Sequence, residues 1–320
     1  MKLPQQRHVF GPVPSRRLGR SLGVDPVPFK TCCYDCVYCQ LGRTTDLTTE
    51  RRPYVPAATL IDELAAWLAR GGHADYITLS GSGEPTLNSE VGEVIAWARA
   101  HAHTPVAVLT NGALLWREEV RRDVSCADVL IPSLDAAAGD VYRQVNRPAP
   151  GVDLEQVVEG LVAARLECRG QMWLEVMLVA GLNDTPEHLR ALRRASDHVR
   201  PDRVHLNTVV RPPAEPGVMP LAAADMAGAQ RVLGPRAELI APRTEHPAEH
   251  QEANRADDLM ALLRRRPCTL EDVAVALGVH RAEAAKCLAP LLQDATVRTI
   301  RTLGTTYYAA TAPPGHDAPS

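Results

Sequence analysis

Short apolar runs alternate with helical patterns from residue 59 to about residue 240. Five of the runs are rich in β-forming residues and end at a polar or Gly/Pro turn, so they predict strands. These runs are 76–79, 106–109, 129–131, 173–179 and 204–209. The spacing of apolar residues around them predicts helices over 60–70, 89–101, 116–123, 154–167, 187–199 and 222–233.

Strands and helices that repeat at this spacing predict parallel βα units, and the continuous apolar strands indicate a sheet covered on both faces. A further strand is expected near 21–24, and Thr59 is expected to cap the first helix. About six βα units result, which fits a partial or complete barrel or an open doubly wound sheet.

The pattern changes after residue 241. Residues 242–254 contain two Pro, three Glu and two His without an apolar period, and they predict a linker. The chain is therefore expected to divide into a barrel domain over 1–241, this linker, a smaller domain over 255–312 and a frayed tail over 313–320.

The smaller domain has the element order of a winged helix-turn-helix. Its pattern predicts three helices followed by a β-hairpin, with Gly278 turning the chain between the second and third helices. Thr269 begins a capping-box sequence for the second helix. The expected elements are helices over 256–265, 270–277 and 281–293 and strands over 297–301 and 305–309.

Composition excludes several classes of protein. Of the 320 residues, 45% are hydrophobic and 23% charged, which is typical of a soluble globular protein and excludes disorder as the main state. A formal net charge of −3 gives no whole-chain electrostatic case for nucleic acid binding. No apolar run reaches the roughly 18 residues of a membrane span, and the first residues lack a signal peptide's apolar segment. We therefore expect a cytoplasmic protein with no membrane partner.

The cysteines are the most informative residues for function. Four of the eight lie within eight residues, at Cys32, Cys33, Cys36 and Cys39, and the others are scattered singly. This grouping indicates a metal site rather than a disulfide framework. Three thiolates spaced Cys-x3-Cys-x2-Cys can hold three irons of a 4Fe-4S cluster and leave the fourth iron with an open position. The alternatives are structural zinc, which needs four closed ligands, and a redox disulfide.

The cysteine spacing, with Tyr38 just before the last cysteine, resembles the radical S-adenosylmethionine (radical SAM) superfamily. Over about residues 8–240 the flanking runs resemble the branch related to archaeal wyosine-forming tRNA enzymes. Those runs are GPVPSRRLG at 11–19, PFKTC at 28–32 and YCQLGR at 38–43. No cysteine precedes Cys32, so the second cluster of those enzymes has no counterpart in this sequence, and their carbon-transfer chemistry is not predicted.

The resemblance implies an α/β fold with a partial (β/α)6 TIM-like barrel. It implies a 4Fe-4S cluster on Cys32, Cys36 and Cys39, with SAM bound to the open iron through its amino and carboxylate groups. It also implies reductive cleavage of SAM to methionine and a 5′-deoxyadenosyl radical that abstracts hydrogen from a substrate. Such an enzyme is expected to be oxygen-sensitive and to need an electron donor such as flavodoxin or ferredoxin.

Function in a parallel βα barrel sits at the carboxyl ends of the strands. Glycines after the 76–79 strand let the backbone approach a ligand, and in the family this segment, with Glu84, holds the methionine amino group. The family also uses the strand that contains Asn207 for adenine and ribose contacts. The expected cofactor contacts are Tyr38, Gly81, Ser82, Gly83, Glu84, Asn111, Ser133, Asp135, Glu175 and Asn207.

Several of these residues have a structural alternative. The glycine-rich segment can be an ordinary βα turn, Asn111 can form an Asx-turn and Asp135 can cap a helix. An ionised Glu175 within an apolar strand is costly unless paired, so it is expected to face the barrel interior. There it contacts cofactor or substrate, or it pairs with Arg169 or Arg203.

Basic residues near the site have two interpretations each. A loop with Arg16, Arg17 and Arg20 can bind a substrate phosphate or carboxylate, or it is a solvated turn. Arg211 can bind a carboxylate or cap a loop. Lys30, close to the cysteines in sequence, can favour their thiolate form.

The preferred hypothesis is a radical SAM enzyme acting on a tRNA base, a protein or peptide, or a small metabolite, among which the sequence does not choose. The alternative is an iron–sulfur-dependent regulator that binds DNA or a partner through its winged helix. The third helix of that domain offers Arg281 and Lys286 against Glu283 and Asp294, which makes a poor phosphate-binding face.

Overall fold

A computed structural model describes residues 7–240 and 255–311. Its main feature is an eight-stranded sheet in the order β1-β2-β5-β6-β7-β8-β9-β10. From β2 to β10 neighbouring strands are parallel, and β1 pairs antiparallel with β2. The strands are β1 Val9–Ser15, β2 Gly19–Val24, β5 Tyr76–Leu79, β6 Val106–Thr110, β7 Val129–Pro132, β8 Gln171–Leu178, β9 Arg203–Thr208 and β10 Ala237–Leu239.

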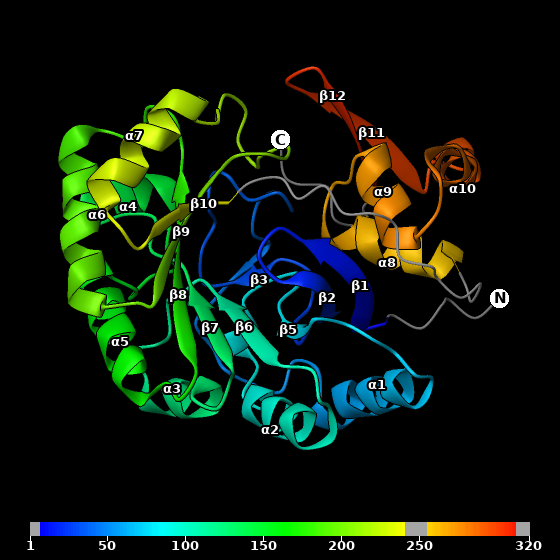
Figure 1. Cartoon of the computed structure of the whole chain (residues 1–320), viewed down its shortest axis with the longest axis horizontal. Helices are drawn as coiled ribbons and strands as arrows, with labels where there is room; N and C mark the ends of the chain where they lie inside the picture. Colours follow the sequence, from blue (N-terminus) through cyan, green and yellow to red (C-terminus); the bar gives the residue numbers. More distant parts are fainter. Residues whose placement is uncertain (1–6, 241–254, 312–320) are drawn as a thin grey trace.

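Helices connect successive strands and cover the outside of the curved sheet (Figure 1). Counted from β2 to β9, each parallel strand is followed by at least one helix, so the βα pattern expected from the sequence is confirmed. The first and last strands in the sheet order, β1 and β10, do not pair, so the barrel is partial. The helices are α1 Ala57–Ala69, α2 Val91–His101, α3 Glu118–Val124, α4 Gly139–Val145, α5 Leu154–Glu167, α6 Pro186–Val199 and α7 Ala223–Leu233.

Element boundaries follow local capping chemistry, and one expected cap is wrong. Helix α1 begins at Ala57 with Pro56 as its N-cap, and Thr59 lies inside the first turn. The carboxylate of Glu90 accepts the Ala57 N–H at 2.7 Å and satisfies a donor that no side chain of α1 reaches. A distant carboxylate therefore replaces the local Thr cap.

The sequence pattern did not predict β1, α4, β10 or the short parallel pair β3 Thr31–Cys32 and β4 Asp46–Leu47. Strand β1 contains Pro12 and Pro14, which interior strands exclude because proline lacks an N–H, but β1 lies at the sheet edge. The remaining elements are too short to produce a helical or strand period.

Two apolar cores lie on opposite faces of the sheet. The larger packs the outer faces of the strands against the surrounding helices, with Leu60, Ile95 and Leu161 among its fully buried members. A smaller core inside the barrel packs Leu18, from the turn between β1 and β2, against Ile131 and Trp173. The β1–β2 turn therefore enters the barrel interior and brings its neighbouring arginines with it.

Residues 255–310 form three helices and an antiparallel hairpin around a third core. Thr269 and Asp272 make the expected capping box, and Gly278 ends α9 in the left-handed conformation. These elements lie beside β1, whose Val13 packs against their core (Figure 1). They are α8 Arg255–Arg265, α9 Leu270–Leu277, α10 Arg281–Gln293, β11 Val297–Thr302 and β12 Thr305–Ala310.

The expected linker over 242–254 and tail over 313–320 lie outside the described residues. Among the helices that the structure describes, none is both long and apolar enough to cross a membrane.

Candidate functional site

The cysteine loop follows β2 at the carboxyl end of the sheet and is held against the end of α4 by backbone hydrogen bonds. The Val37 N–H donates to Val145 O at 3.0 Å, and the Ala149 N–H donates to Cys33 O at 2.8 Å. The side chain of Cys33 is fully buried in the outer core, so it contributes to apolar packing and does not join the other three cysteines as a metal ligand. These backbone contacts hold the loop against the end of α4.

Each of the other three cysteine sulfurs accepts one hydrogen bond from a nitrogen, and the donors come from three separate parts of the chain. The bonds are Lys30 Nζ to Cys39 Sγ at 3.2 Å, Asn111 Nδ2 to Cys32 Sγ at 3.5 Å and Asn146 Nδ2 to Cys36 Sγ at 3.6 Å. Nitrogen donors aimed at sulfur favour a negatively charged thiolate, which is the form that binds metal.

Burial of the sulfurs opposes ionisation. It raises the pKa of Cys32 to about 12, and it raises the pKa of Cys36 well above its ordinary value. The nitrogen donors alone therefore do not make these thiols into thiolates near neutral pH. A bound cationic metal centre does, because a coordinating thiol is deprotonated outright.

The number of cysteines in the loop bears on which metal centre they can hold. Within residues 7–240 and 255–311, no three His, Cys, Asp or Glu side chains gather closely enough to hold one metal ion. Structural zinc requires four ligands around one centre, so this arrangement disfavours zinc. Three cysteine sulfurs that each accept an N–H hydrogen bond fit a multi-iron cluster in which each cysteine binds a different iron.

The segment after β5 packs against the cysteine loop through its backbone. Lys30 N donates to Ser82 O at 2.7 Å, and Glu84 N donates to Thr31 O at 3.0 Å. A Cβ at Gly83 would lie 2.0 Å from Thr31 O, so only glycine permits this approach. Gly83 therefore permits close packing on the cysteine loop, and the expected approach of this backbone to a ligand stays a prediction.

Gly81 is required for a second close approach. Its φ is +152°, and a Cβ there would lie 2.3 Å from Cγ of Asp25. This lets Asp25 accept from Ser82 N at 3.0 Å and from Ser82 Oγ at 2.6 Å. The glycines thus position Ser82 through a carboxylate at the end of β2.

Glu84 is buried and its carboxylate is saturated by donors from the protein. It accepts from Thr86 N at 3.0 Å, Thr86 Oγ1 at 2.7 Å, Thr110 Oγ1 at 2.6 Å and Asn111 N at 2.7 Å. Burial raises the pKa of Glu84, and these donors oppose that rise. Glu84 therefore ties the segment after β5 to the end of β6, where Asn111 reaches Cys32.

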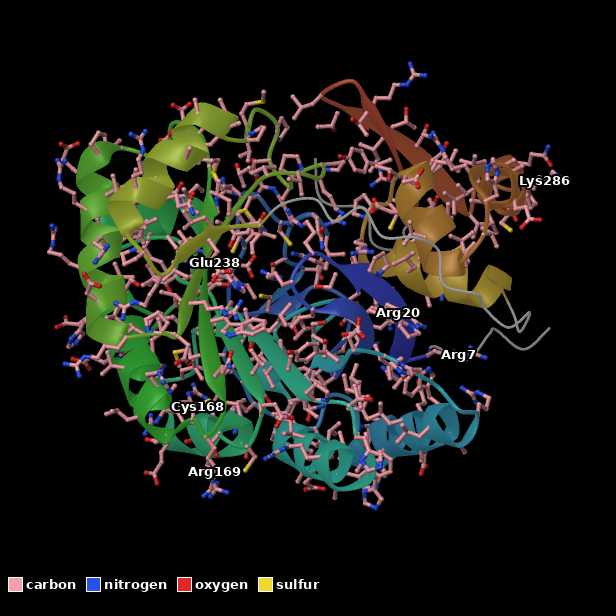
Figure 2. All side chains as sticks on the ribbon, viewed as in Figure 1. Arg7, Arg20, Cys168, Arg169, Glu238 and Lys286 are labelled. Atoms are coloured by element: carbon pink, nitrogen blue, oxygen red, sulfur yellow. The ribbon has the colours of Figure 1, made fainter. Side chains whose placement is uncertain are left out.

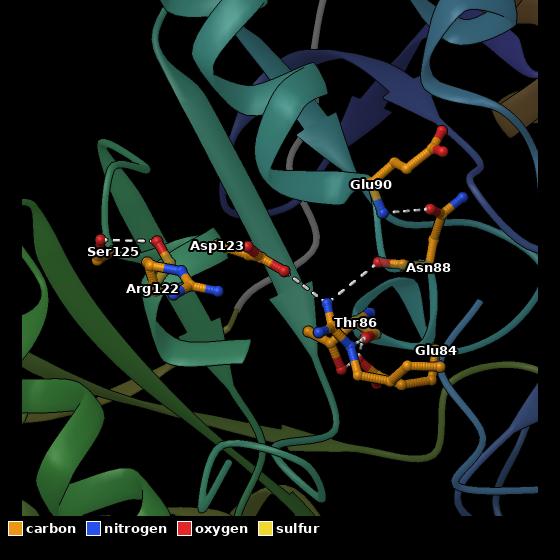
Figure 3. A network of polar contacts seen from close by, with 8 residues as sticks. Glu84, Thr86, Asn88, Glu90, Arg122, Asp123 and Ser125 are labelled. Carbon is orange, nitrogen blue, oxygen red and sulfur yellow. Dashed lines mark hydrogen bonds and ion pairs between the residues drawn. The ribbon is translucent and has the colours of Figure 1, made fainter. Parts of the chain in front are cut away.

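This network extends outward to α3. Figure 3 shows Glu84, Thr86, Asn88 and Asp123 around the short helix that follows Glu84. Arg51 donates to Thr86 O at 2.9 Å and pairs with Asp123 at 2.5 Å. Arg51 thus links the turn that carries Glu84 to α3.

Asp135, at the end of β7, links the cysteine loop to two other elements. Its carboxylate accepts from Tyr38 Oη, from Asn146 Nδ2 at 2.7 Å and from Met177 N at 2.9 Å. Burial raises the pKa of Asp135 to about 6. The helix-cap alternative for Asp135 is wrong, because α4 has Ala138 at its N-cap with no side-chain cap.

Glu175 lies in β8 two residues after Trp173, which packs inside the barrel, so strand alternation puts Glu175 on the interior face. It pairs with Arg17 and accepts from Asn207 Nδ2 at 3.1 Å. Burial alone would raise the pKa of Glu175, but Arg17 lowers it below its ordinary value. Ser133 lies next to it in a bridge between β7 and β8.

The structural partners expected for Glu175 are therefore wrong. Arg169 is exposed at the periphery of the molecule, near α3 (Figure 2). Arg203 pairs instead with Glu238 at 3.6 Å. The actual partner, Arg17, comes from a turn that the sequence did not place inside the barrel.

The expected residues thus fall into linked groups. Tyr38, Asp135 and Cys36 share one network, and Asn111 joins Glu84 to Cys32. Asn111 Oδ1 also accepts Ala113 N at 2.9 Å, so the Asx-turn and the sulfur contact coexist. Sequence reasoning missed Asn146, because the short α4 that positions it has no clear helical period.

The family model of the radical SAM superfamily matches residues 27–209, which contain the cysteine loop and all strands from β5 to β9. The chain belongs to the radical SAM superfamily. Its cofactors are therefore S-adenosylmethionine and a 4Fe-4S cluster, in agreement with the donor set around the cysteines.

The chain is similar to several curated proteins and solved structures. A UPF0026 protein from Synechocystis is 38% identical over 64% of this chain and 76% of its own length. A protein named GTPase Obg from Brachyspira hyodysenteriae is 34% identical over 91% of this chain, but the chain spans only 43% of that protein. A radical SAM methyltransferase from Sphaerobacter thermophilus shares the fold, with a TM-score of 0.52, 18% identity and coverage of 68% of this chain and 65% of its own.

Proposed function

We propose that Cys32, Cys36 and Cys39 hold the 4Fe-4S cluster of this radical SAM enzyme and that its substrate binds in the polar interior of the barrel. When bound, the cluster and SAM supply a 5′-deoxyadenosyl radical by reductive cleavage, and this radical abstracts hydrogen from the substrate. The observation that carries the proposal is the set of three nitrogen donors, one on each cysteine sulfur.

Two groups of residues support the cysteine sulfurs in different ways. Lys30, Asn111 and Asn146 stabilise negative charge on the sulfurs. Glu84 holds Asn111 and Asp135 holds Asn146 through hydrogen bonds that already fill their carboxylates. These two carboxylates therefore act first as positioning groups.

The interior side chains of the barrel are the better candidates for ligand contact. Ser133, directly after β7, lies next to Glu175 of β8 and near Asn207 of β9, on or next to the interior face. Each carries polar atoms that can orient a hydroxyl or amide. They support a substrate or cofactor polar group at this level of the barrel.

The substrate classes are a tRNA base, a protein or peptide, or a small metabolite, and the electron donor is a protein such as flavodoxin or ferredoxin. The branch resembling wyosine-forming enzymes is supported by the motifs around the cysteines. The three helices and hairpin over 255–310 support a winged helix. Its third helix is a weak DNA-binding face, since Arg281 pairs with Glu271 at 3.4 Å, and this favours the enzyme over the regulator.

The test is anaerobic reconstitution with iron and sulfide, reduction by dithionite and addition of SAM. The wild type is expected to release 5′-deoxyadenosine, and Cys36→Ala is expected to release none above background, because one iron loses its protein ligand. Cys33→Ala is the matched control and should keep the cluster, since Cys33 lies in the outer core.

Iron and sulfide content, measured for each protein, shows whether a cluster is present. A wild type with a full cluster that forms no 5′-deoxyadenosine would contradict the proposal. Activity of Cys36→Ala equal to that of the wild type would contradict the assignment of the ligands.

A further inference from the structure

Four arginines from three distant segments gather beside β1. Arg16 and Arg17 lie in the β1–β2 turn, Arg211 follows β9 and Arg266 directly follows α8. Their guanidinium groups act on one another: burial first, and then Arg211, Arg17 and Arg266, lower the pKa of Arg16 to about 10. Burial and then Arg266 likewise lower the pKa of Arg211. Like charges are thus held together at this junction.

Most of the hydrogen-bond partners of this cluster are neutral. Arg211 Nη1 donates to Gln40 Oε1 at 3.3 Å, and Arg266 donates to Pro14 O at 3.4 and 3.5 Å. The Nε atoms of Arg211 and Arg266 are both buried and have no hydrogen-bond partner among the described residues. A buried N–H of a charged group without an acceptor is costly.

Two carboxylates of the described residues act on this cluster, and both have other partners. Glu175, which acts on Arg16, pairs with Arg17. Asp272, which acts on Arg211, is shared with the Thr269 capping box. Among the described residues, the charges that act on Arg16 and Arg211 are therefore mainly positive. Uncompensated charges of one sign in a partly buried site require a counter-anion.

A phosphate group has the charge and the acceptors that this cluster lacks. It carries nearly two negative charges near neutral pH, and its oxygens accept several hydrogen bonds. Planar guanidinium groups match phosphate oxygens with paired donors, which lysines do not. The two buried Nε atoms are the donors still available to it.

We propose that Arg16, Arg211 and Arg266 form a phosphate-binding site between the partial barrel and the C-terminal elements, and that it holds a phosphate group of the substrate. The binding site is inferred from the arrangement of the arginines. That the bound phosphate belongs to the substrate rests on the proposed function. Arg17 and Glu175 connect this site to the barrel interior, so a molecule anchored here by phosphate extends toward Asn207.

The site needs both parts of the chain, because Arg266 comes from the end of α8 while Arg16 and Arg211 belong to the barrel. The hairpin also contributes, since Tyr307 Oη donates to Val210 O at 2.7 Å, next to Arg211. The C-terminal elements therefore complete a substrate site and are not only an appendage.

The experiment is anaerobic calorimetric titration of the cluster-loaded full chain with inorganic phosphate at low ionic strength, in the absence of SAM. We expect Arg211→Gln and Arg266→Gln each to weaken phosphate binding at least tenfold, and Arg266→Lys to give an intermediate affinity. Arg264→Gln is the matched control, because Arg264 is exposed in the last turn of α8, two residues before Arg266, and its affinity should stay within twofold of the wild type.

Iron content and thermal unfolding identify variants that do not fold. If one of the two glutamine variants does not fold, the other still tests the site. No phosphate binding by the wild type, or binding by the folded glutamine variants within twofold of it, would overturn the proposal. Tighter binding of malonate than of phosphate would overturn the phosphate assignment.

The titration is independent of SAM cleavage. Phosphate binding without any 5′-deoxyadenosine formation would remove the proposed function and leave this site standing. Formation of 5′-deoxyadenosine with unchanged phosphate binding in the variants would remove this site and leave the proposed function.

Discussion

Buried charged groups are treated differently in two regions of this protein. At the cysteine end of the barrel, the carboxylates of Asp25, Glu84 and Asp135 each accept at least three hydrogen bonds from the protein. In the arginine cluster, two buried Nε atoms have no acceptor in the described part of the chain. The cysteine end is therefore organised by the chain alone, whereas the arginine cluster is complete only with an anion.

Two adjacent arginines show this contrast directly. Arg265 Nε donates to Asp25 Oδ2 at 3.0 Å, with side-chain exposures of 7% and 2%, and its guanidinium stacks on Phe10 at 4.2 Å. The next residue, Arg266, donates to the carbonyl of Pro14 and has no carboxylate partner among the described residues. One arginine supports the loop that carries Ser82, and the other belongs to the cluster with surplus charge.

The largest expected effect comes from replacing these two arginines in turn. Arg265→Met leaves Asp25 buried without its cation, which costs about 3–5 kcal/mol of unfolding free energy. Arg266→Met removes a surplus charge and a buried N–H without an acceptor, so the unfolding free energy should stay the same or rise in phosphate-free buffer. Urea unfolding of both variants measures the difference, and equal losses would break the comparison.

The second-largest expected effect is a pH dependence of stability that comes from His205. Burial and then Arg17 lower the pKa of His205 to about 4. Because the unfolded chain takes up this proton near pH 6.5 and the folded chain does not, stability falls as the pH drops from 6.5 toward 4.

In this window each unit of pH changes the unfolding free energy by up to about 1.4 kcal/mol. Between pH 7 and 5.5 the wild type should therefore lose about 1 kcal/mol more unfolding free energy than His205→Gln. Urea unfolding at both pH values measures this, and other groups cancel in the difference. Parallel pH profiles for the two proteins would contradict the unfavourable protonation of His205.

The smallest effect concerns the hairpin contact. Tyr307→Phe removes the hydrogen bond to Val210 O and should cost about 1 kcal/mol of unfolding free energy. It should also weaken phosphate binding, because Val210 precedes Arg211. Tyr308→Phe is the control, since no hydrogen bond of its hydroxyl occurs within the described residues, and its phosphate affinity should be unchanged. Equal phosphate affinity of Tyr307→Phe and the wild type would show that the hairpin does not support the cluster.

Most regular elements follow from local sequence patterns. Helices α5, α9 and α10 have the expected bounds, because apolar period and caps act over a few residues. Strand β1 and helix α4 do not show such patterns. Strand β1 contains prolines, which a sheet edge tolerates, and α4 has only seven residues. Asn146, at the end of α4, was missed for the same reason.

The sequence by itself determined the cofactor class, because Cys32, Cys36 and Cys39 lie within one loop and their spacing is a local property. It also determined the parallel βα architecture, which depends on a repeating pattern. Only the tertiary structure decided which charges meet: Arg17 with Glu175, and Arg265 with Asp25 across 240 residues of sequence. The physical reason is that the partner of a buried charge is chosen by which segments the fold brings within a few ångströms, and no local pattern encodes that proximity.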